Sequence, residues 1–273
     1  MRIVSRDYAK KVLKKILPER AVSFRRRFAT YIKNRPRISF SYAGEDLLVN
    51  QLLPLDIDFK NIRYLDIGCE NPLIANNTYY FYKRGARGIC IDARKELGFM
   101  YKIFRPKDIF LSYFVTESET NSELLNFYVN PDDPHISSGN KDWAKGNLPR
   151  ELPPRQVQTI PLSGIIKLNH FLIGEDPALF TILSIDTESY DLNVLRSNDW
   201  KSFRPDIICV ESHIDGNMLK YLASDIHLFL EECKYFLAST NGLSAIYKKI
   251  DLISTNALGE PTELTEMLDT LGD

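Results

Sequence analysis

Acidic residues follow four short apolar segments of the sequence, each at the point where the segment ends. They lie in Asp66–Gly68, at Asp92, in Asp186–Glu188 and in Glu211–His213. In an open parallel sheet, ligands bind beyond the carboxyl ends of the strands, where the strand order reverses. Carboxylates and an imidazole at such an edge can bind hydroxyl groups or cations and can accept protons. The sequence therefore predicts one site built from all four segments.

The turn after the first segment indicates which ligand this site takes. A dinucleotide site would need Gly-x-Gly-x-x-Gly to bring the backbone close to a pyrophosphate. The turn here, Gly68–Pro72, has one glycine and adds Glu70, a carboxylate that repels phosphate. Asp92 ends the second segment, where an acid accepts hydrogen bonds from ribose hydroxyls. NAD and ATP are therefore poor candidates, whereas a cationic adenosine ligand without phosphate, of which S-adenosylmethionine is the common example, fits.

The elements that must position these residues alternate between strand and helix. Strand patterns, most of them followed by helical patterns, lie at 62–67, 87–92, 108–117, 179–186 and 206–211. Such alternation implies parallel strands joined by right-handed crossovers. The last two apolar segments, 235–239 and 244–248, are close enough in sequence to predict an antiparallel hairpin. The expected fold class is α/β, a three-layer sandwich with a mostly parallel seven-stranded sheet and a C-terminal antiparallel hairpin.

Charge is divided unevenly along the chain. The net charge is -1, but residues 1–40 have a balance of +11 and residues 41–273 a balance of -12. We expect a basic helical arm over 1–40, a folded domain over 41–251 and an acidic tail over 252–273. The sequence predicts basic amphipathic helices for this arm, and such helices suit anionic membrane surfaces. The alternative is that the arm packs on the domain with its charges solvated.

Composition argues against several classes of protein. Hydrophobic residues make up 44% of the chain and aromatic residues 11%, which excludes disorder throughout. The mean hydropathy of -0.23 and the lack of an apolar run near eighteen residues argue against a membrane-spanning helix. The four cysteines show no metal-site or disulfide spacing. The first residues lack the apolar core of a secretory signal, so we expect a reduced, cytoplasmic setting.

A series of short motifs runs in order over about residues 40–250. They are Ser41–Asp46, Tyr64–Gly68 with Asn71-Pro72, Asn77-Thr78, Gly88–Asp92, Arg105-Pro106 with Asp108, Leu183–Glu188 with Val194-Leu195, and Arg204–Glu211. Each motif alone is weak, but the ordered set resembles the FkbM-type methyltransferases. The resemblance implies a Rossmann-like class I methyltransferase that uses S-adenosylmethionine to methylate hydroxyls. Members often act on sugars of surface polysaccharides or of glycolipid precursors.

The resemblance also implies which residues hold the cofactor. They are Asp66, Gly68 and Asn71 at its methionine end, Asp92 at its ribose, and Glu45 and Asp46 near its amine. The chain departs from the family pattern at Ser189, where glycine usually follows the glutamate. A serine there narrows the space in which the backbone can approach a substrate.

Methyl transfer to a sugar hydroxyl needs a base or a metal to help remove the hydroxyl proton. His213 is the first candidate base, because an imidazole titrates near neutral pH. Asp186 is the alternative base, and Glu188 is a further candidate catalytic residue. Asp186 and Glu211 also form a candidate site for a divalent cation such as Mg²⁺, since hard cations prefer oxygen ligands. The competing structural interpretation is that His213 is a loop residue and that the carboxylates cap helices or form salt bridges.

Residues 118–160 break the strand–helix alternation. Residues 124–129 predict an extra strand, and 130–154 predict a long loop rich in Pro, Asp, Gly and Asn. A loop of this length inside a compact domain is usually functional. We expect His135–Gly139, with Trp143 nearby, to close over the methyl acceptor, an ordinary surface loop being the alternative.

Two rival functions stay open at this point. A nucleic-acid methyltransferase would use residues 1–40 as an electrostatic grip. A non-catalytic module would keep the fold without binding the cofactor. Ser189 and the single-glycine turn at Gly68 leave this alternative open. We expect a small-molecule or glycan acceptor rather than nucleic acid.

Overall fold

The computed structural model describes residues 37–117, 123–130, 137–147, 153–169, 179–212 and 217–250. Residue contacts divide the chain into Met1–Ile38 and Ser39–Asp273, and the fold below belongs to the second unit. Most of the expected arm and the whole of the expected tail therefore lie outside the described residues. Within the described residues, no helix is both long and apolar enough to cross a membrane.

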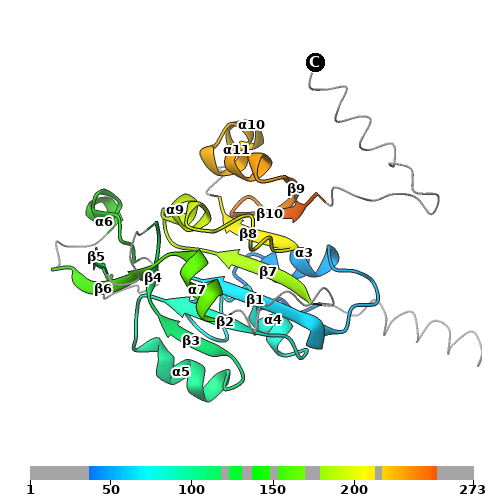
Figure 1. Ribbon diagram of the computed structural model, residues 1–273, viewed down its shortest axis with the longest axis horizontal. Coiled ribbons are helices and arrows are strands. Elements are labelled where there is room, and N and C mark those ends of the chain that lie inside the picture. The colour runs from blue at the N-terminus through cyan, green and yellow to red at the C-terminus, as the bar shows by residue number, and fades with distance from the viewer. Residues whose placement is uncertain are drawn as a thin grey trace, which may run out of the picture. The chain divides into compact units, whose positions relative to one another are not determined.

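A seven-stranded sheet forms the centre of the domain, with strand order β3-β2-β1-β7-β8-β10-β9 (Figure 1). β10 is antiparallel to both of its neighbours, while the pairs among β3, β2, β1, β7 and β8 are parallel. This confirms the expected mostly parallel sheet with a C-terminal antiparallel hairpin. The strands are β1 (Ile62–Ile67), β2 (Arg87–Asp92), β3 (Ile109–Ser112), β7 (Phe180–Ile185), β8 (Ile207–Glu211), β9 (Tyr235–Thr240) and β10 (Ser244–Lys249).

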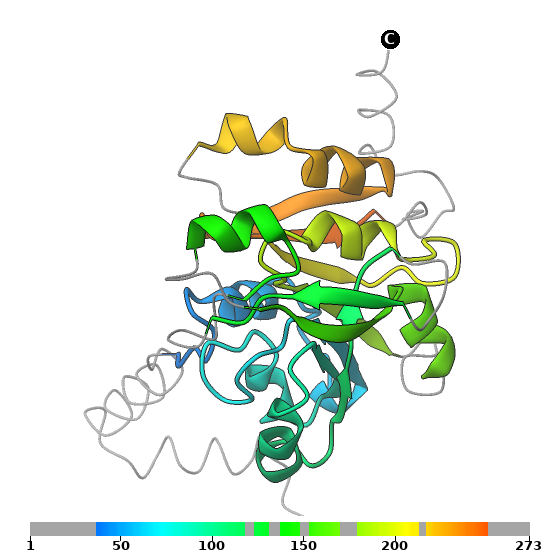
Figure 2. The same cartoon turned by 90° about the vertical axis from the view of Figure 1, so that its left-hand side faces the viewer.

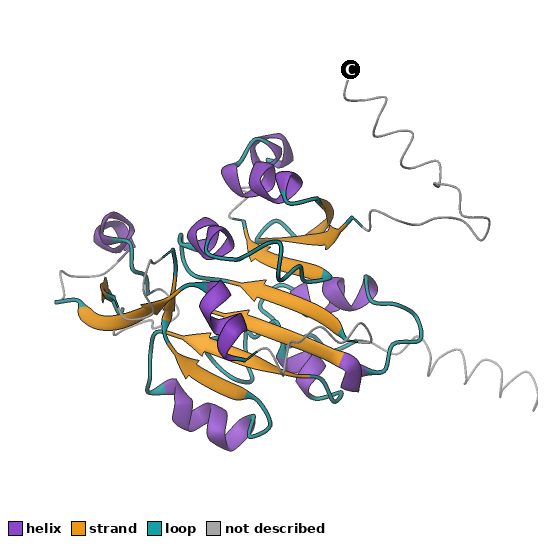
Figure 3. Cartoon of the chain, in the orientation of Figure 1, coloured by secondary structure: helices purple, strands orange, loops and turns teal. Residues whose placement is uncertain are grey.

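Helices cover both faces of this sheet, as the expected three layers require (Figure 3). Side chains alternate between the faces of a strand. Leu65 of β1 belongs to a buried cluster with α7 and α9, whereas Tyr64 belongs to a second cluster with α3 and α4. The helices are α3 (Glu45–Gln51), η1 (Phe59–Asn61), α4 (Tyr79–Tyr82), α5 (Leu97–Phe104), α6 (Lys141–Asn147), α7 (Leu162–Leu168), α9 (Asp191–Arg196), α10 (Met218–Leu222) and α11 (Asp225–Glu232).

The strand order reverses between β1 and β7, because the chain adds β2 and β3 on one side of β1 and β7 and β8 on the other. Ile67 at the end of β1 pairs with Ile91 of β2 and with Ile185 of β7. The next residues along the three strands therefore lie at one edge of the sheet. They are Gly68, Asp92 and Asp186.

A second sheet of three strands lies beside this edge, in the order β4-β6-β5 (Figure 2). Its strands are β4 (Phe114–Val115), β5 (Leu124–Phe127) and β6 (Arg155–Ile160). The single strand expected over 108–117 is therefore wrong, because Phe114 and Val115 leave the main sheet and pair with β6. The loop expected over 130–154 is also interrupted, by α6.

Two short helices, α10 and α11, precede β9. α10 ends before Ser224, whose side chain accepts a hydrogen bond from the backbone of His227 and caps the start of α11. A serine side chain that binds the backbone in this way favours a helix start over a helix interior.

Candidate active site

A pocket of about 600 Å³ opens at the carboxyl ends of β1, β2, β7 and β8. The position is the one that the strand ends predict, and the volume is within the range of small-molecule sites. Six of the residues predicted to be catalytic, cofactor-binding or metal-binding line it: Glu45, Gly68, Asp92, Asp186, Glu188 and Glu211.

The electrostatic character of the pocket is strongly acidic. Six carboxylates line it, and Arg94 is the one lysine or arginine among the lining residues that the structure describes. A pocket of this charge favours cations and disfavours phosphates.

Gly68 begins the turn that follows β1. Its φ is 77°, a backbone conformation that favours glycine, and its backbone nitrogen donates to the carbonyl oxygen of Ile91 at 2.9 Å. A Cβ atom at this position would lie 1.7 Å from the carbonyl oxygen of Asp186. The ends of β1 and β7 therefore approach each other so closely that only glycine fits between them.

Asp92 binds the side chain of Arg94 with both carboxylate oxygens. Oδ1 accepts from the backbone nitrogen and the Nε of Arg94, each at 2.9 Å. Oδ2 accepts from Nη2 of Arg94 at 2.9 Å and from the backbone nitrogen of Glu70 at 3.2 Å. Burial acts to lower the pKa of Arg94, but the hydrogen bonds and charge of Asp92 and the charge of Glu70 raise it overall. Arg94 is therefore charged at neutral pH.

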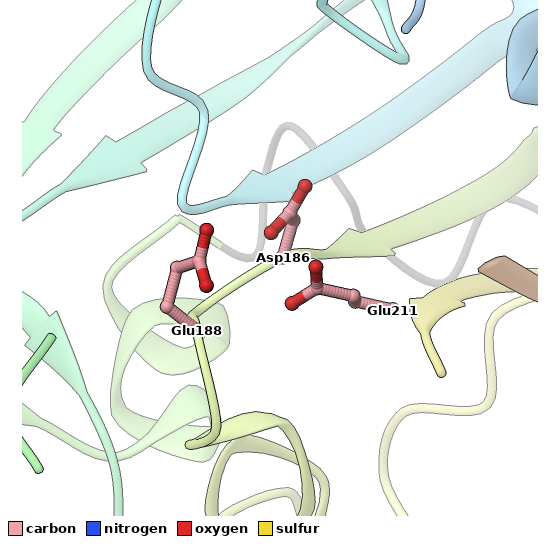
Figure 4. Close-up of side chains that lie close together, drawn as sticks. All are labelled: Asp186, Glu188 and Glu211. Atoms are coloured by element: carbon pink, nitrogen blue, oxygen red, sulfur yellow. The ribbon is translucent and has the colours of Figure 1, made fainter. Parts of the chain in front are cut away.

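Three carboxylates lie together beyond β7 and β8. Asp186, Glu188 and Glu211 each offer an oxygen atom within 4.8 Å of the others, and the three side chains converge (Figure 4). Asp186 is exposed to solvent in the pocket, yet desolvation by the surrounding protein, followed by the negative charges of Glu211, Asp191 and Glu188, raises its pKa above the ordinary value. The same two effects, burial and then Glu211, raise the pKa of Asp191 to about 6. Asp186 therefore takes up a proton more readily than an ordinary carboxylate, and the oxygen atoms of the cluster suit a hard cation.

The backbone beside this cluster is strained. Glu188 and Ser189 both have positive φ, 51° and 80°, which side chains other than glycine rarely adopt. Ser138 Oγ donates to the carbonyl oxygen of Glu188 at 2.7 Å and holds this conformation from the opposite segment. The departure from the family pattern at Ser189 is therefore a serine in a conformation that suits glycine.

The segment expected to close over the acceptor reaches the pocket in part. Ser137 lines the pocket, and Ser138 forms a bridge with Tyr128. His135 and His213 lie outside the described residues, as does the side chain of Trp143.

Three of the predicted cofactor residues do not line the pocket. Asp66 is buried in β1, where Thr78 Oγ1 donates to its Oδ2 at 2.5 Å. Asp46 accepts from Ser39 Oγ and from the backbone nitrogen of Phe40, each at 2.7 Å. The third residue, Asn71, accepts from the backbone within its own turn.

Glu45 differs from its neighbour Asp46 because its side chain reaches the pocket wall. Its Oε2 accepts from the backbone nitrogen of Ala43 at 2.9 Å, and its Oε1 accepts from Asn241 Nδ2 at 2.8 Å. Asn241 follows β9, so these bonds join the start of α3 to the hairpin.

One wall of the pocket is apolar and was missed by the sequence reasoning. Tyr113, Phe114, Val115 and Phe127 line it, and the Phe114 and Phe127 ring centroids are 5.8 Å apart. Aromatic residues at both strand patterns were the available signal. Their meeting depends on the second sheet, which local patterns do not specify.

Comparison with known proteins gives a distant structural neighbour and a family. The TehB-like SAM-dependent methyltransferase from Corynebacterium glutamicum is 11% identical, with a TM-score of 0.34; the match covers 86% of this chain and 100% of that one. A likeness this distant supports no conclusion about the chain. No curated protein matches the sequence. Residues 66–237 match the Methyltransferase FkbM domain, and this match spans more than half of the chain. The protein therefore belongs to the FkbM methyltransferase family.

Proposed function

We propose that this methyltransferase transfers a methyl group from S-adenosylmethionine to a hydroxyl group of a sugar, in a surface polysaccharide or a glycolipid precursor. The observation that carries the proposal is the acidic pocket at the strand-order reversal, with Asp92 at the end of β2. A sulfonium cofactor without phosphate matches the excess of carboxylates in the pocket.

Residues that line the pocket would hold this cofactor. Asp92 would hold the ribose hydroxyls, and the glycine turn at Gly68 would let the backbone approach the methionine end. Glu45 would face the cofactor amine, since its carboxylate lines the same pocket. When bound, S-adenosylmethionine supplies a methyl group activated by a positively charged sulfur. Asp66, Asn71 and Asp46 would support the cofactor indirectly, by holding the loops around it.

Asp186 is the base that this geometry favours. Its raised pKa means that it takes up a proton more readily than an ordinary carboxylate. Glu188 lies beside it and would orient the acceptor hydroxyl. Aligning the acceptor oxygen with the reacting carbon supplies several kcal/mol of the barrier. His213 is the second candidate base.

A divalent cation such as Mg²⁺ is the alternative partner of the cluster. Asp186, Glu188 and Glu211 supply three oxygen atoms at a spacing that a cation can bridge. Such an ion would lower the pKa of an acceptor hydroxyl, and the three residues would position it. Titration of Mg²⁺ and Mn²⁺ into wild type and Asp186→Asn tests this, because binding that the variant retains excludes the cluster.

The apolar wall of the pocket supports the proposal of a sugar acceptor. The rings of Phe114 and Phe127 provide an apolar wall, and Ser137 also lines the pocket. Flat aromatic surfaces with a few polar groups suit the faces of a pyranose. We propose further that residues 1–40 bring the enzyme to an anionic membrane at its cytoplasmic face, where glycolipid acceptors would be found.

Calorimetry with S-adenosylmethionine and S-adenosylhomocysteine tests the cofactor. Wild type is expected to bind with a micromolar Kd, about -8 kcal/mol. Asp92→Ala is expected to bind much more weakly. Asp142→Ala is the matched control, because Asp142 is exposed on α6 and pairs only locally with Lys145. Absence of binding to wild type would leave a methyltransferase fold without the cofactor.

Formation of S-adenosylhomocysteine with a panel of hydroxylated sugars and glycolipids then tests the acceptor. Turnover with sugars that is lost in Asp186→Asn supports the proposal. Turnover only with RNA or DNA would replace the sugar acceptor with a nucleic acid.

A further inference from the structure

Asp92 has no acceptor position to spare. A carboxylate has about four lone-pair sites. Four donors fill them, and three of the four belong to Arg94: its backbone nitrogen, its Nε and its Nη2. The fourth donor is the backbone nitrogen of Glu70.

This arrangement conflicts with ribose binding. A ribose diol would bring two hydroxyl donors to the carboxylate. The two backbone donors cannot leave without unfolding their turns, whereas the two side-chain donors of Arg94 can. A ribose therefore reaches Asp92 only when the Arg94 guanidinium withdraws.

A second acceptor for the guanidinium lies beside it. Nη1 of Arg94 is 3.7 Å from Oε1 of Glu70, longer than a hydrogen bond but within ion-pair range. The Glu70 side chain is 20% exposed, whereas those of Asp92 and Arg94 are 5% and 7% exposed. Solvent therefore reaches Glu70. An Arg94 guanidinium that leaves Asp92 would keep Glu70 as a charged partner and would not become an unpaired buried charge.

We propose that Arg94 and the cofactor ribose compete for Asp92, and that Glu70 receives the Arg94 guanidinium when the ribose binds. The proposal rests on the proposed function, because it assumes an adenosine cofactor. It makes Arg94 a residue that sets cofactor affinity, and Glu70 the residue that lowers the cost of displacing it.

The competition predicts a change of affinity with an unusual sign. Most pocket substitutions weaken binding, but Arg94→Met is expected to tighten the binding of S-adenosylhomocysteine about tenfold. This is the gain if the arrangement open to ribose is populated about one tenth of the time in wild type. A merely structural role for Arg94 would weaken binding instead.

The ribose hydroxyls must be the origin of this gain. The 2′,3′-dideoxy analogue of S-adenosylhomocysteine has nothing to bond to Asp92, so Arg94→Met is expected to leave its affinity within about twofold of wild type. Arg155→Met is the matched control, because Arg155 pairs with Glu96 on the surface and is 56% exposed. It is expected to change neither affinity.

Glu70→Gln gives a second test in which Arg94 stays in place. Without the Glu70 carboxylate, the displaced Arg94 guanidinium has no charged partner to move to. S-adenosylhomocysteine is therefore expected to bind several-fold more weakly. In the Arg94→Met background the same substitution is expected to have no effect. The single substitution does not depend on the folding of Arg94→Met, and unchanged or tighter binding to Glu70→Gln overturns the role of Glu70.

Weaker or unchanged binding of S-adenosylhomocysteine to a folded Arg94→Met overturns the competition. An equal gain for the dideoxy analogue also overturns it, because the ribose hydroxyls would then play no part. If neither wild type nor any variant binds an adenosine ligand, the proposed function fails instead. Calorimetry therefore separates the two outcomes.

Discussion

Arg105 donates from Nε to Oδ2 of Asp108 at 2.7 Å. Both side chains are buried, with exposed fractions of 0% for Arg105 and 1% for Asp108. The guanidinium also donates to Asn76 Oδ1 at 3.0 Å and to Thr78 Oγ1 at 2.9 Å. Both of these residues lie in the segment between β1 and α4, of which Ala75 lines the pocket. The buried ion pair therefore fixes the loop that borders the site.

Removing this guanidinium should destabilise the whole domain. Arg105→Met leaves the buried carboxylate of Asp108 without its charged partner, so we expect the free energy of unfolding to fall by about 3–5 kcal/mol. Urea denaturation followed by circular dichroism measures the change. Arg155→Met, at an exposed ion pair, should lower it by no more than about 1 kcal/mol. Equal effects of the two substitutions would show that burial of the pair is unimportant.

Gly68→Ala should disrupt the pocket edge. The added Cβ would lie 1.7 Å from the Asp186 carbonyl oxygen, so β1 and β7 must separate where they end. We expect a loss of about 3 kcal/mol or more in unfolding free energy, with loss of cofactor binding. Gly242→Ala is the control, since it has a similar φ of +93° but nothing within 4 Å of its Cβ. Its cost should be only the backbone strain, about 1–2 kcal/mol. Similar losses for both would rule out the close approach as the cause.

Ser189→Gly should relieve strain. The left-handed backbone of Ser189 costs about 1–2 kcal/mol, and glycine would relieve this strain. The greater flexibility of glycine in the unfolded chain would offset about 0.5–1 kcal/mol of that gain. We expect the melting temperature to rise by a few degrees. Ser189→Ala keeps a Cβ in the same conformation and should not raise it. A glycine variant no more stable than the alanine variant would contradict this account.

Stability should fall as the pH rises from about 4 to about 6. The pKa of Asp191 is raised from 3.8 to about 6, so between these values the native state keeps a proton that the unfolded state has lost. The native state then loses stability with rising pH, by on the order of 2–3 kcal/mol in total.

Asp191→Asn tests this pH dependence. An amide oxygen can accept the two bonds that Asp191 Oδ1 accepts from Thr187, each 3.1 Å long, but does not titrate. Urea denaturation of both proteins at a series of pH values should give a flatter profile for Asp191→Asn and a more stable variant at pH 7. A profile unchanged by the substitution would assign the slope to other groups.

The strand ends could be predicted from the sequence because each strand is a short apolar segment. Strand–helix alternation then implies parallel strands, whose carboxyl ends meet at one edge of the sheet. That is why Gly68, Asp92 and Asp186 are at the pocket as expected. The direction of Asp66 was available as well, since it lies two residues after Tyr64 and so faces the same side of β1. Tyr64 packs in the cluster with α3 and α4, so the side chain of Asp66 lies on that face of the sheet and does not line the pocket.

Other parts of the site depend on contacts that local patterns do not encode. Phe114 reaches the pocket because β4 pairs with β6, more than forty residues further along the chain. Arg94 matters because its side chain folds back onto Asp92, and nothing in the spacing of the two residues requires that. Both contacts depend on tertiary packing, and the local sequence is compatible with other conformations at Phe114 and Arg94.

The pocket has two walls with different origins in the chain. The aromatic wall, together with Ser137, comes from residues 113–137, a stretch that contains β4 and β5 of the second sheet. Gly68 and Asp92 come before this stretch in the chain, and Asp186 comes after it. Substitutions in the aromatic wall can therefore change that side of the pocket while the residues at the ends of β1, β2 and β7 stay the same. The stretch of chain that would contact a methyl acceptor is thus separate in sequence from the strand ends that would hold the proposed cofactor.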